Sequence, residues 1–333
     1  MLKTIGSISI ESSPYTFYSL QPEDAAQCYA LSSHPEINFG ETVENWQEAI
    51  ESSKGLAFAI IEKEESNNSA VFPHVKKIKI IATGIGIPFN RKTRLCNGVV
   101  HPSYQRQGLG RQLCNYLINE AAKRSLSYLE LDGSSAGKSL YESVGFKVET
   151  EALSFYRKAE AISRWKWIEI ALLPSNSSLF LRSNKDLDEV IELDAQAFGS
   201  ARTDHIKRIA AIATKRILVD RQGDKVVGFL IYQEERDGVR IGPWVHSNPV
   251  GAEKLLKMAI TLISSRFPST QISVHTISAV AMKVLETYNF SKASFTSYRM
   301  YKQSEADNDS LKPKDSPQSN PHIYYSMWSF GMG

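Results

Sequence analysis

Val99–Lys123 reads VVHPSYQRQGLGRQLCNYLINEAAK and joins the end of an apolar strand to an amphipathic helix through a turn that contains two glycines. Gly108 and Gly110 allow the backbone of this turn to approach a ligand closely. The first N–H groups of the helix have no partner within the helix, and together with the helix dipole they favour an anion. We therefore predict that the turn binds a pyrophosphate, assisted by Arg106 and Arg111.

A second motif makes this prediction more specific, because two glycines between a strand and a helix also occur in turns that bind nothing. Gln105-x-x-Gly108-x-Gly110 matches the Gln/Arg-x-x-Gly-x-Gly/Ala phosphate loop of the GNAT acyl-CoA N-acyltransferases. Leu129–Phe146, LELDGSSAGKSLYESVGF, resembles the second signature of that superfamily, a strand and a short helix that end in Leu-Tyr-Glu-x-x-Gly-Phe. Together the two motifs identify the first half of the chain as similar to GNAT proteins.

The second half repeats the order of elements of the first half. Its closing helix ends in VLETYNF (284–290), against LYESVGF (140–146) in the first half. This alignment puts Leu285 opposite Tyr141, and puts Glu253 where the phosphate loop needs its second glycine. A carboxylate at that position repels a phosphate. The chain thus resembles a tandem GNAT protein whose second copy is degenerate and whose coenzyme lies in the first copy.

The predicted fold class is α/β, with two GNAT-like domains in tandem, each a mixed, largely antiparallel twisted sheet flanked by helices. A length of 333 residues suits two such domains. The predicted limits are 1–158 for an acyl-CoA-binding and catalytic domain, 159–176 for a connecting segment, 177–302 for the degenerate domain, 303–321 for a disordered loop and 322–333 for a strand that packs back on the second domain. Within the second half we expect a strand at Ser178–Arg182 and a helix capped by Asn184.

The resemblance implies transfer of an acyl group, usually acetyl, from acetyl-CoA to a primary amine, without a metal. Tyr141 matches the frequent general acid of the superfamily, although a tyrosine on an amphipathic helix is also a common core residue. Backbone N–H groups at the end of the strand are suited to polarise the thioester carbonyl. The implied coenzyme-binding residues are Val99, Val100, His101, Gln105, Arg106, Gln107, Gly108, Leu109, Gly110, Arg111 and Gln112. Candidates for the general base are His101, Glu130, Asp132 and Asp204, and the sequence favours none of them.

Two other functions fit parts of the sequence. Gly133–Ser139 resembles the phosphate-binding loop of nucleoside triphosphatases. However, only three residues separate Gly133 from Gly137-Lys-Ser, and that loop needs four. A protein that binds acyl-CoA without catalysis, as a sensor or scaffold, is the alternative that the sequence leaves open. Retention of Tyr141 favours the enzyme.

Composition limits the remaining classes. A hydrophobic content of 42%, a charged content of 23% and a net charge of +3 indicate a soluble protein, with neither a nucleic-acid surface nor a membrane span. The N-terminal residues contain no apolar signal region. Three cysteines suit a reducing compartment, so we expect a cytoplasmic protein with Cys28, Cys96 and Cys114 as buried packing residues. The acceptor amine, whether small molecule or protein, and the oligomeric state are not encoded in any motif.

Overall fold

The computed structural model describes residues 15–37, 42–62, 79–90, 92–160, 179–181, 183–213, 216–235, 238–303, 320 and 324–326. The N-terminal residues discussed above, most of the predicted connecting segment and nearly all of the predicted disordered loop lie outside these ranges. Among the described helices, none has the length and apolar character needed to cross a bilayer.

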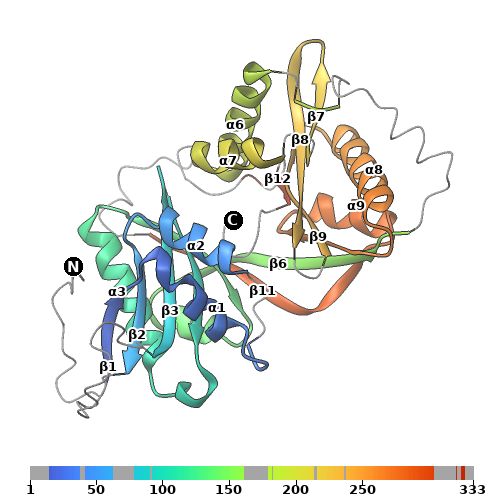
Figure 1. Cartoon of the computed structure of the whole chain (residues 1–333). Coiled ribbons are helices and arrows are strands. Elements are labelled where there is room, and N and C mark those ends of the chain that lie inside the picture. The colour runs from blue at the N-terminus through green and yellow to red at the C-terminus, as the bar shows by residue number, and fades with distance from the viewer. Residues whose placement is uncertain are drawn as a thin grey trace.

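The first half is a twisted sheet with helices on both faces (Figure 1). Its strands are β1 (Tyr15–Ser19), β2 (Ala57–Glu62), β3 (Ile80–Phe89), β4 (Lys92–Val100) and β5 (Tyr128–Ser134), antiparallel except for the β4–β5 pair. Its helices are α1 (Ala25–Ser32), α2 (Val43–Ser52), α3 (Leu109–Lys123) and α4 (Lys138–Ser143), with 3-10 turns at Pro22–Asp24 and Pro102–Tyr104. The apolar side of α3 packs on β2 and β3, and α1 and α2 cover the opposite face.

The second half repeats this arrangement. It contains α6 (Asn184–Phe198), α7 (Thr203–Ala213), β7 (Ile217–Gln222), β8 (Lys225–Glu235), β9 (Gly238–His246), α8 (Pro249–Arg266), β10 (Gln271–Thr276), α9 (Ala279–Thr287), β11 (Ser291–Gln303) and β12 (Tyr324–Ser326). Helices α8 and α9 pack on one face of its sheet, and α6 and α7 on the other. The predicted α/β class and the repetition of one arrangement in the two halves are therefore confirmed.

The two halves exchange strands and form one sheet. Among the described residues, twelve strands are joined in the order β1-β2-β3-β4-β5-β11-β6-β10-β9-β8-β7, and β12 pairs with β9. Strand β11 of the second half lies between β5 and β6, while β6 (Lys147–Lys158) of the first half pairs with β11 and β10. Figure 1 shows β6 and β11 running between the halves. The predicted limit at residue 158 therefore falls at the end of a strand that lies between two strands of the second half.

Two local predictions in the second half need correction. Ser183, not Asn184, is the N-cap of α6: its Oγ accepts a hydrogen bond from the N–H of Asp186 at 3.3 Å, and Asn184 is the first helical residue. The strand expected at Ser178–Arg182 lies partly outside the described residues, and its described part makes only an isolated bridge, from Phe180 to Leu218.

Buried apolar side chains hold the halves together. Phe89 of β3 meets Phe198 of α6 edge to face, with ring centroids 5.2 Å apart.

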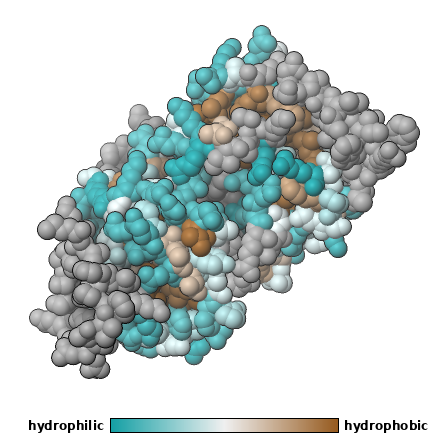
Figure 2. All heavy atoms as spheres, viewed as in Figure 1, coloured by the Kyte–Doolittle hydropathy of each residue, from teal (hydrophilic) through white to brown (hydrophobic). Residues whose placement is uncertain are grey.

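The face of the molecule in Figure 2 is largely hydrophilic, with hydrophobic residues in small groups. The large apolar side chains that are exposed among the described residues are Val148, Val250 and Phe295.

Candidate active site

The site begins where β4 and β5 separate. These parallel strands pair only at Thr93–Leu129 and Arg94–Glu130, although β4 continues to Val100 and β5 to Ser134. An irregularity in β4 accompanies the separation, because its register on β3 shifts between Thr83 and Ile85 and Asn97 has a φ of +54°. A bulge of this kind bends a strand and ends its pairing.

A cavity of about 670 Å³ occupies the gap between the separated strands. Its walls include Cys96 and Asn97 of β4, and Leu131 and Asp132 of β5. Consecutive residues of a strand point to opposite faces of a sheet. The cavity therefore passes through the sheet, from the side of α3 and α4 to the opposite side.

The predicted phosphate turn lies at one end of this passage. Gly108 is the N-cap of α3 and has a φ of +82°, a conformation that glycine adopts without strain. The side chain of Gln105 donates from Nε2 to the carbonyl oxygen of Val100 at 3.0 Å and so holds the turn against the strand. A Cβ at Gly110 would lie 3.5 Å from Leu140 and 3.6 Å from Val100, which leaves room for a small side chain only.

The predicted coenzyme residues fall into two groups. Val99, Val100 and Gly110 line the cavity. Gln105, Arg106, Gln107, Gly108, Arg111 and Gln112 are exposed on the turn and first helical residues, and Leu109 is buried beneath them. An exposed row of backbone N–H groups and cationic side chains at a helix N-terminus fits a diphosphate.

His101 is positioned differently. Its backbone N–H donates to the carbonyl oxygen of Ile81 at 2.9 Å, so the sheet already uses this donor. Its Nδ1 accepts from the N–H of Ser103 and caps the 3-10 turn that follows. His101 is not among the described residues that line the cavity. These contacts favour a structural role over that of a base.

Tyr141 lies beside the gap. Cβ atoms built on Gly133 and Gly137 would lie 2.9 Å and 3.1 Å from its ring, so these glycines make the space that the ring fills. A Cβ on Gly98, in the bulge of β4, would lie 3.2 Å from the hydroxyl oxygen. Burial raises the pKa of Tyr141 above its usual value of 10. The hydroxyl is therefore protonated at neutral pH and adjoins the cavity.

The same packing bears on the nucleoside-triphosphate alternative. Gly133 and Gly137 are covered by the Tyr141 ring, so their backbone is not open to a phosphate. The helix that follows, α4, has only six residues. The geometry agrees with the spacing argument against a nucleotide site.

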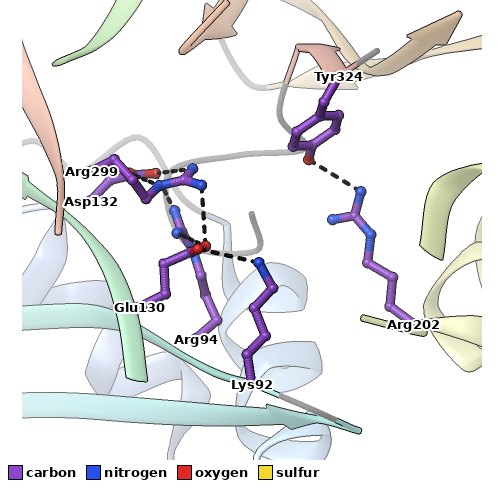
Figure 3. Close-up of polar contacts among 7 residues, drawn as sticks. All are labelled: Lys92, Arg94, Glu130, Asp132, Arg202, Arg299 and Tyr324. Carbon is purple, nitrogen blue, oxygen red and sulfur yellow. Dashed lines mark hydrogen bonds and ion pairs between the residues drawn. The ribbon is translucent and has the colours of Figure 1, made fainter. Parts of the chain in front are cut away.

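Glu130, a candidate base, belongs to a buried ion-pair network at the point where β4 and β5 separate (Figure 3). Its carboxylate contacts Lys92 at 3.2 Å, Arg94 at 2.7 Å and Arg299 at 3.1 Å, and all four side chains have no exposed surface. Burial alone would raise the pKa of Glu130, but the charges of Arg299, Lys92 and Arg94 lower it to about 2. Such a carboxylate is a very weak base.

The positions of the other two candidates, Asp132 and Asp204, also do not suit a general base. Asp132 lines the cavity, but its carboxylate is paired with Arg94 and with Arg299, whose Nε lies 2.6 Å from Oδ1. Asp204 is exposed on α7 and is not among the described lining residues. The sequence did not suggest Arg299, which comes from the second half and joins both carboxylates of β5.

All three cysteines are buried and free, as predicted. Cys96 and Cys114 line the cavity. Burial raises the pKa of the Cys114 thiol to about 12, so it remains protonated and is a poor nucleophile.

In the second half, the chain itself occupies the space under the start of α8 and the edge of β9 beyond its pairing with β10. The ring of His246 occupies the space between Gly228 and Gly251, where added Cβ atoms would lie within 2.1 Å of it. His246 is fixed by Asp220 at 3.1 Å and by the N–H of Asn248 at 3.0 Å. Parallel pairing of β9 with β10 ends at Ile241–Val274, and β12 then pairs with β9.

The two residues aligned with functional positions of the first half have other roles. Glu253 accepts a hydrogen bond from the hydroxyl of Tyr288 at 2.8 Å. Leu285 is fully buried in the apolar core under α8. The second half thus keeps the fold, and its residues at these positions take part in packing and hydrogen bonds within the second half.

Comparison with known proteins agrees with this arrangement. Families described as acetyltransferase (GNAT) domains match residues 67–148 and 190–312, one in each half. The chain is a tandem GNAT protein. A putative acetyltransferase from Pyrococcus horikoshii of known structure is similar over 96% of both chains, with a TM-score of 0.70 and 20% identity, which shows the shared fold.

Curated relatives with names are similar over shorter stretches. The [ribosomal protein bS18]-alanine N-acetyltransferase of Escherichia coli K12 is 45% identical over 65 residues, 19% of this chain and 44% of that protein. The mycothiol acetyltransferase of Renibacterium salmoninarum is 26% identical over 191 residues, 55% of this chain and 54% of that one. The match therefore spans about half or less of these relatives. The tandem GNAT protein is accordingly a member of an acetyltransferase family, and both of these relatives carry the names of acetyltransferases.

Proposed function

We propose that this protein transfers an acetyl group from acetyl-CoA to a primary amine. The observation that carries the proposal is the cavity through the sheet, with the phosphate turn at one side and a polar face at the other. A thioester and an amine that enter from opposite faces would meet between β4 and β5, and holding two reactants in this way lowers the barrier of their reaction.

Each group of residues has a defined task in this reaction. Acetyl-CoA supplies an activated acyl group. The turn from Gln105 to Gln112 binds the diphosphate through backbone N–H groups and arginines. The Tyr141 hydroxyl, protonated at neutral pH, donates a proton or a hydrogen bond to the departing sulfur. The neutral amine attacks the thioester carbon, the C–S bond breaks, and the proton that the nitrogen loses passes to solvent water. The rate should therefore rise with pH until the acceptor amine is neutral in solution.

We further propose one coenzyme per chain, held by the first half. In the second half, His246 packs under the start of α8 and β12 pairs with β9 beyond its pairing with β10, and Pro249 lacks a backbone donor near the start of α8. The free cysteines suit the cytoplasm, where we expect the protein to act.

Two measurements with the full chain test the proposal. Calorimetric titration with acetyl-CoA should give a stoichiometry near one. An assay of CoA release over a panel of amines should give turnover with at least one acceptor class. Binding with no release in the presence of any amine would identify an acyl-CoA sensor instead, and absence of binding would reject both functions.

A further inference from the structure

The face of the sheet on the acceptor side is polar from the first half into the second. Residues that pair directly across strands point to the same side. The register links Ser134 of β5 to Ser297 of β11, Ser154 of β6 to His275 of β10, and Tyr156 of β6 through Ser273 of β10 to Arg240 of β9. All of these residues except Ser154 line the cavity. We name this surface the polar wall, with Gln271 and Glu235 at its far end.

The alternate residues of the same strands point the other way, into the core. Leu153, Phe155, Ile272 and Val274 are buried with the helix α8. The strict alternation fixes which face the polar wall occupies. Its hydroxyl, amide and imidazole groups are therefore presented to the cavity and not to a helix.

The charges of the polar wall are balanced. Arg240 and Glu235 form an ion pair with each other. Asp132, at the near end, is paired with Arg94 and Arg299. Among the described lining residues, every aspartate, glutamate and arginine thus has a counter-charge.

His275 adds no charge to this balance. Its Nδ1 lies 2.8 Å from the hydroxyl of Ser154. Burial, with a smaller effect from Arg240, lowers the pKa of His275 well below its usual 6.5, so the ring is neutral at physiological pH. The polar wall offers hydrogen bonds and no net charge.

A second charged group on the acceptor would lose its hydrating water at the polar wall. It would find no side chain of opposite charge that is not already paired, so its binding would be unfavourable. Hydroxyl groups would instead find donors and acceptors, and the rings of Tyr156 and Phe295 offer apolar surface beside them. The cavity, about 670 Å³, also holds the arm of the coenzyme and falls within the usual range of small-molecule sites, about 300–1,000 Å³. The polar wall crosses four strand spacings, from β5 to β9, and therefore spans at most about 20 Å.

We propose that the acceptor is a small polyhydroxylated amine, such as an amino sugar, whose amino group is its only charge. This proposal rests on the proposed acetyl transfer and specifies its substrate. The Arg240–Glu235 pair acts as the specificity-determining element, because it excludes a second charge at the far end of the polar wall.

The test measures kcat/KM for CoA release with matched acceptors: glucosamine, glucosamine 6-phosphate, alanine amide, alanine and spermidine. The parent protein should prefer glucosamine to the phosphorylated and polyamine acceptors. Glu235→Gln uncovers the charge of Arg240. It should raise the phosphate-to-neutral ratio about 10-fold or more, the scale of one hydrogen bond to a charged group.

Glu234→Gln is the matched control, because the neighbouring Glu234 pairs with Arg216 and is not among the described lining residues. Its acceptor preference should equal that of the parent, and the melting temperature of both variants reports their folding. A parent preference for an anionic acceptor, spermidine or alanine amide would overturn the proposal, as would an unchanged ratio in folded Glu235→Gln. Acetyl-CoA binding without release for any amine would instead overturn the acetyl transfer itself.

Discussion

Replacement of Gly108 by glutamate tests the phosphate turn. Gly108 is exposed, has a φ of +82° and directly precedes the first residue of α3. A carboxylate about 5 Å from a coenzyme phosphate, at an effective dielectric of about 20, repels it by about 3 kcal/mol. This energy corresponds to a roughly 200-fold increase in the Kd for acetyl-CoA.

Gly108→Gln separates the effect of charge from that of shape. Both variants place a side chain in the left-handed region, which costs about 1–2 kcal/mol of folding stability, and only one of them carries a charge. Calorimetric titration should show weak binding by Gly108→Glu and a much smaller loss by Gly108→Gln. The difference should shrink as salt is added, because the turn is exposed. Equal Kd values for the two variants at low salt would refute a phosphate at this turn.

Three further predictions concern catalysis, stoichiometry and stability. Tyr141→Phe keeps the ring that packs on Gly133 and Gly137, so CoA release should fall by roughly 10²–10⁴ with acetyl-CoA affinity retained; retained turnover would make the tyrosine structural. The single calorimetric site should disappear in Gly108→Glu, whereas a surviving site would place the coenzyme in the second half. Glu130→Gln should reduce the free energy of unfolding by about 3–5 kcal/mol, because it leaves the carboxylate of Asp132 to balance three buried cations. Since the pKa of Glu130 is about 2 in the folded chain and 4.5 is its ordinary value, the parent keeps this stabilisation above pH 4.5 and loses it as the pH falls towards 2, which acid unfolding of parent and variant would measure.

The elements around the site were predictable because their signals are local. The glycine turn, the apolar side of α3 and the motif that ends at Phe146 each lie within some 25 residues, and each reports a conformation or a packed face directly. The one-residue error at the start of α6 arises because Ser183 and Asn184 are both good N-caps, so composition alone does not choose between them.

No local sequence pattern indicates that the two halves exchange strands β6 and β11. Ser291–Gln303 alternates polar and apolar residues, as in any half-buried strand. Arg299 has the pattern of a polar, outward position, and it is buried only because Asp132, 167 residues earlier, lies opposite it. Pairing between strands so distant in sequence is a property of the folded chain, and no window of residues contains it. The same holds for His246, whose role depends on Gly228 and Gly251 meeting around it.

The second half therefore contributes to the walls of the cavity in the first half. Strand β11 forms the outer neighbour of β5, which is one wall of the gap, and Arg299 on β11 joins Glu130 and Asp132 where the gap opens. Strand β6, in turn, is held by β10. The first half thus lacks a closed sheet edge and a balanced ion-pair network without the second. If the second half binds no coenzyme, as we propose, its strands still complete the sheet and its polar residues still line the cavity.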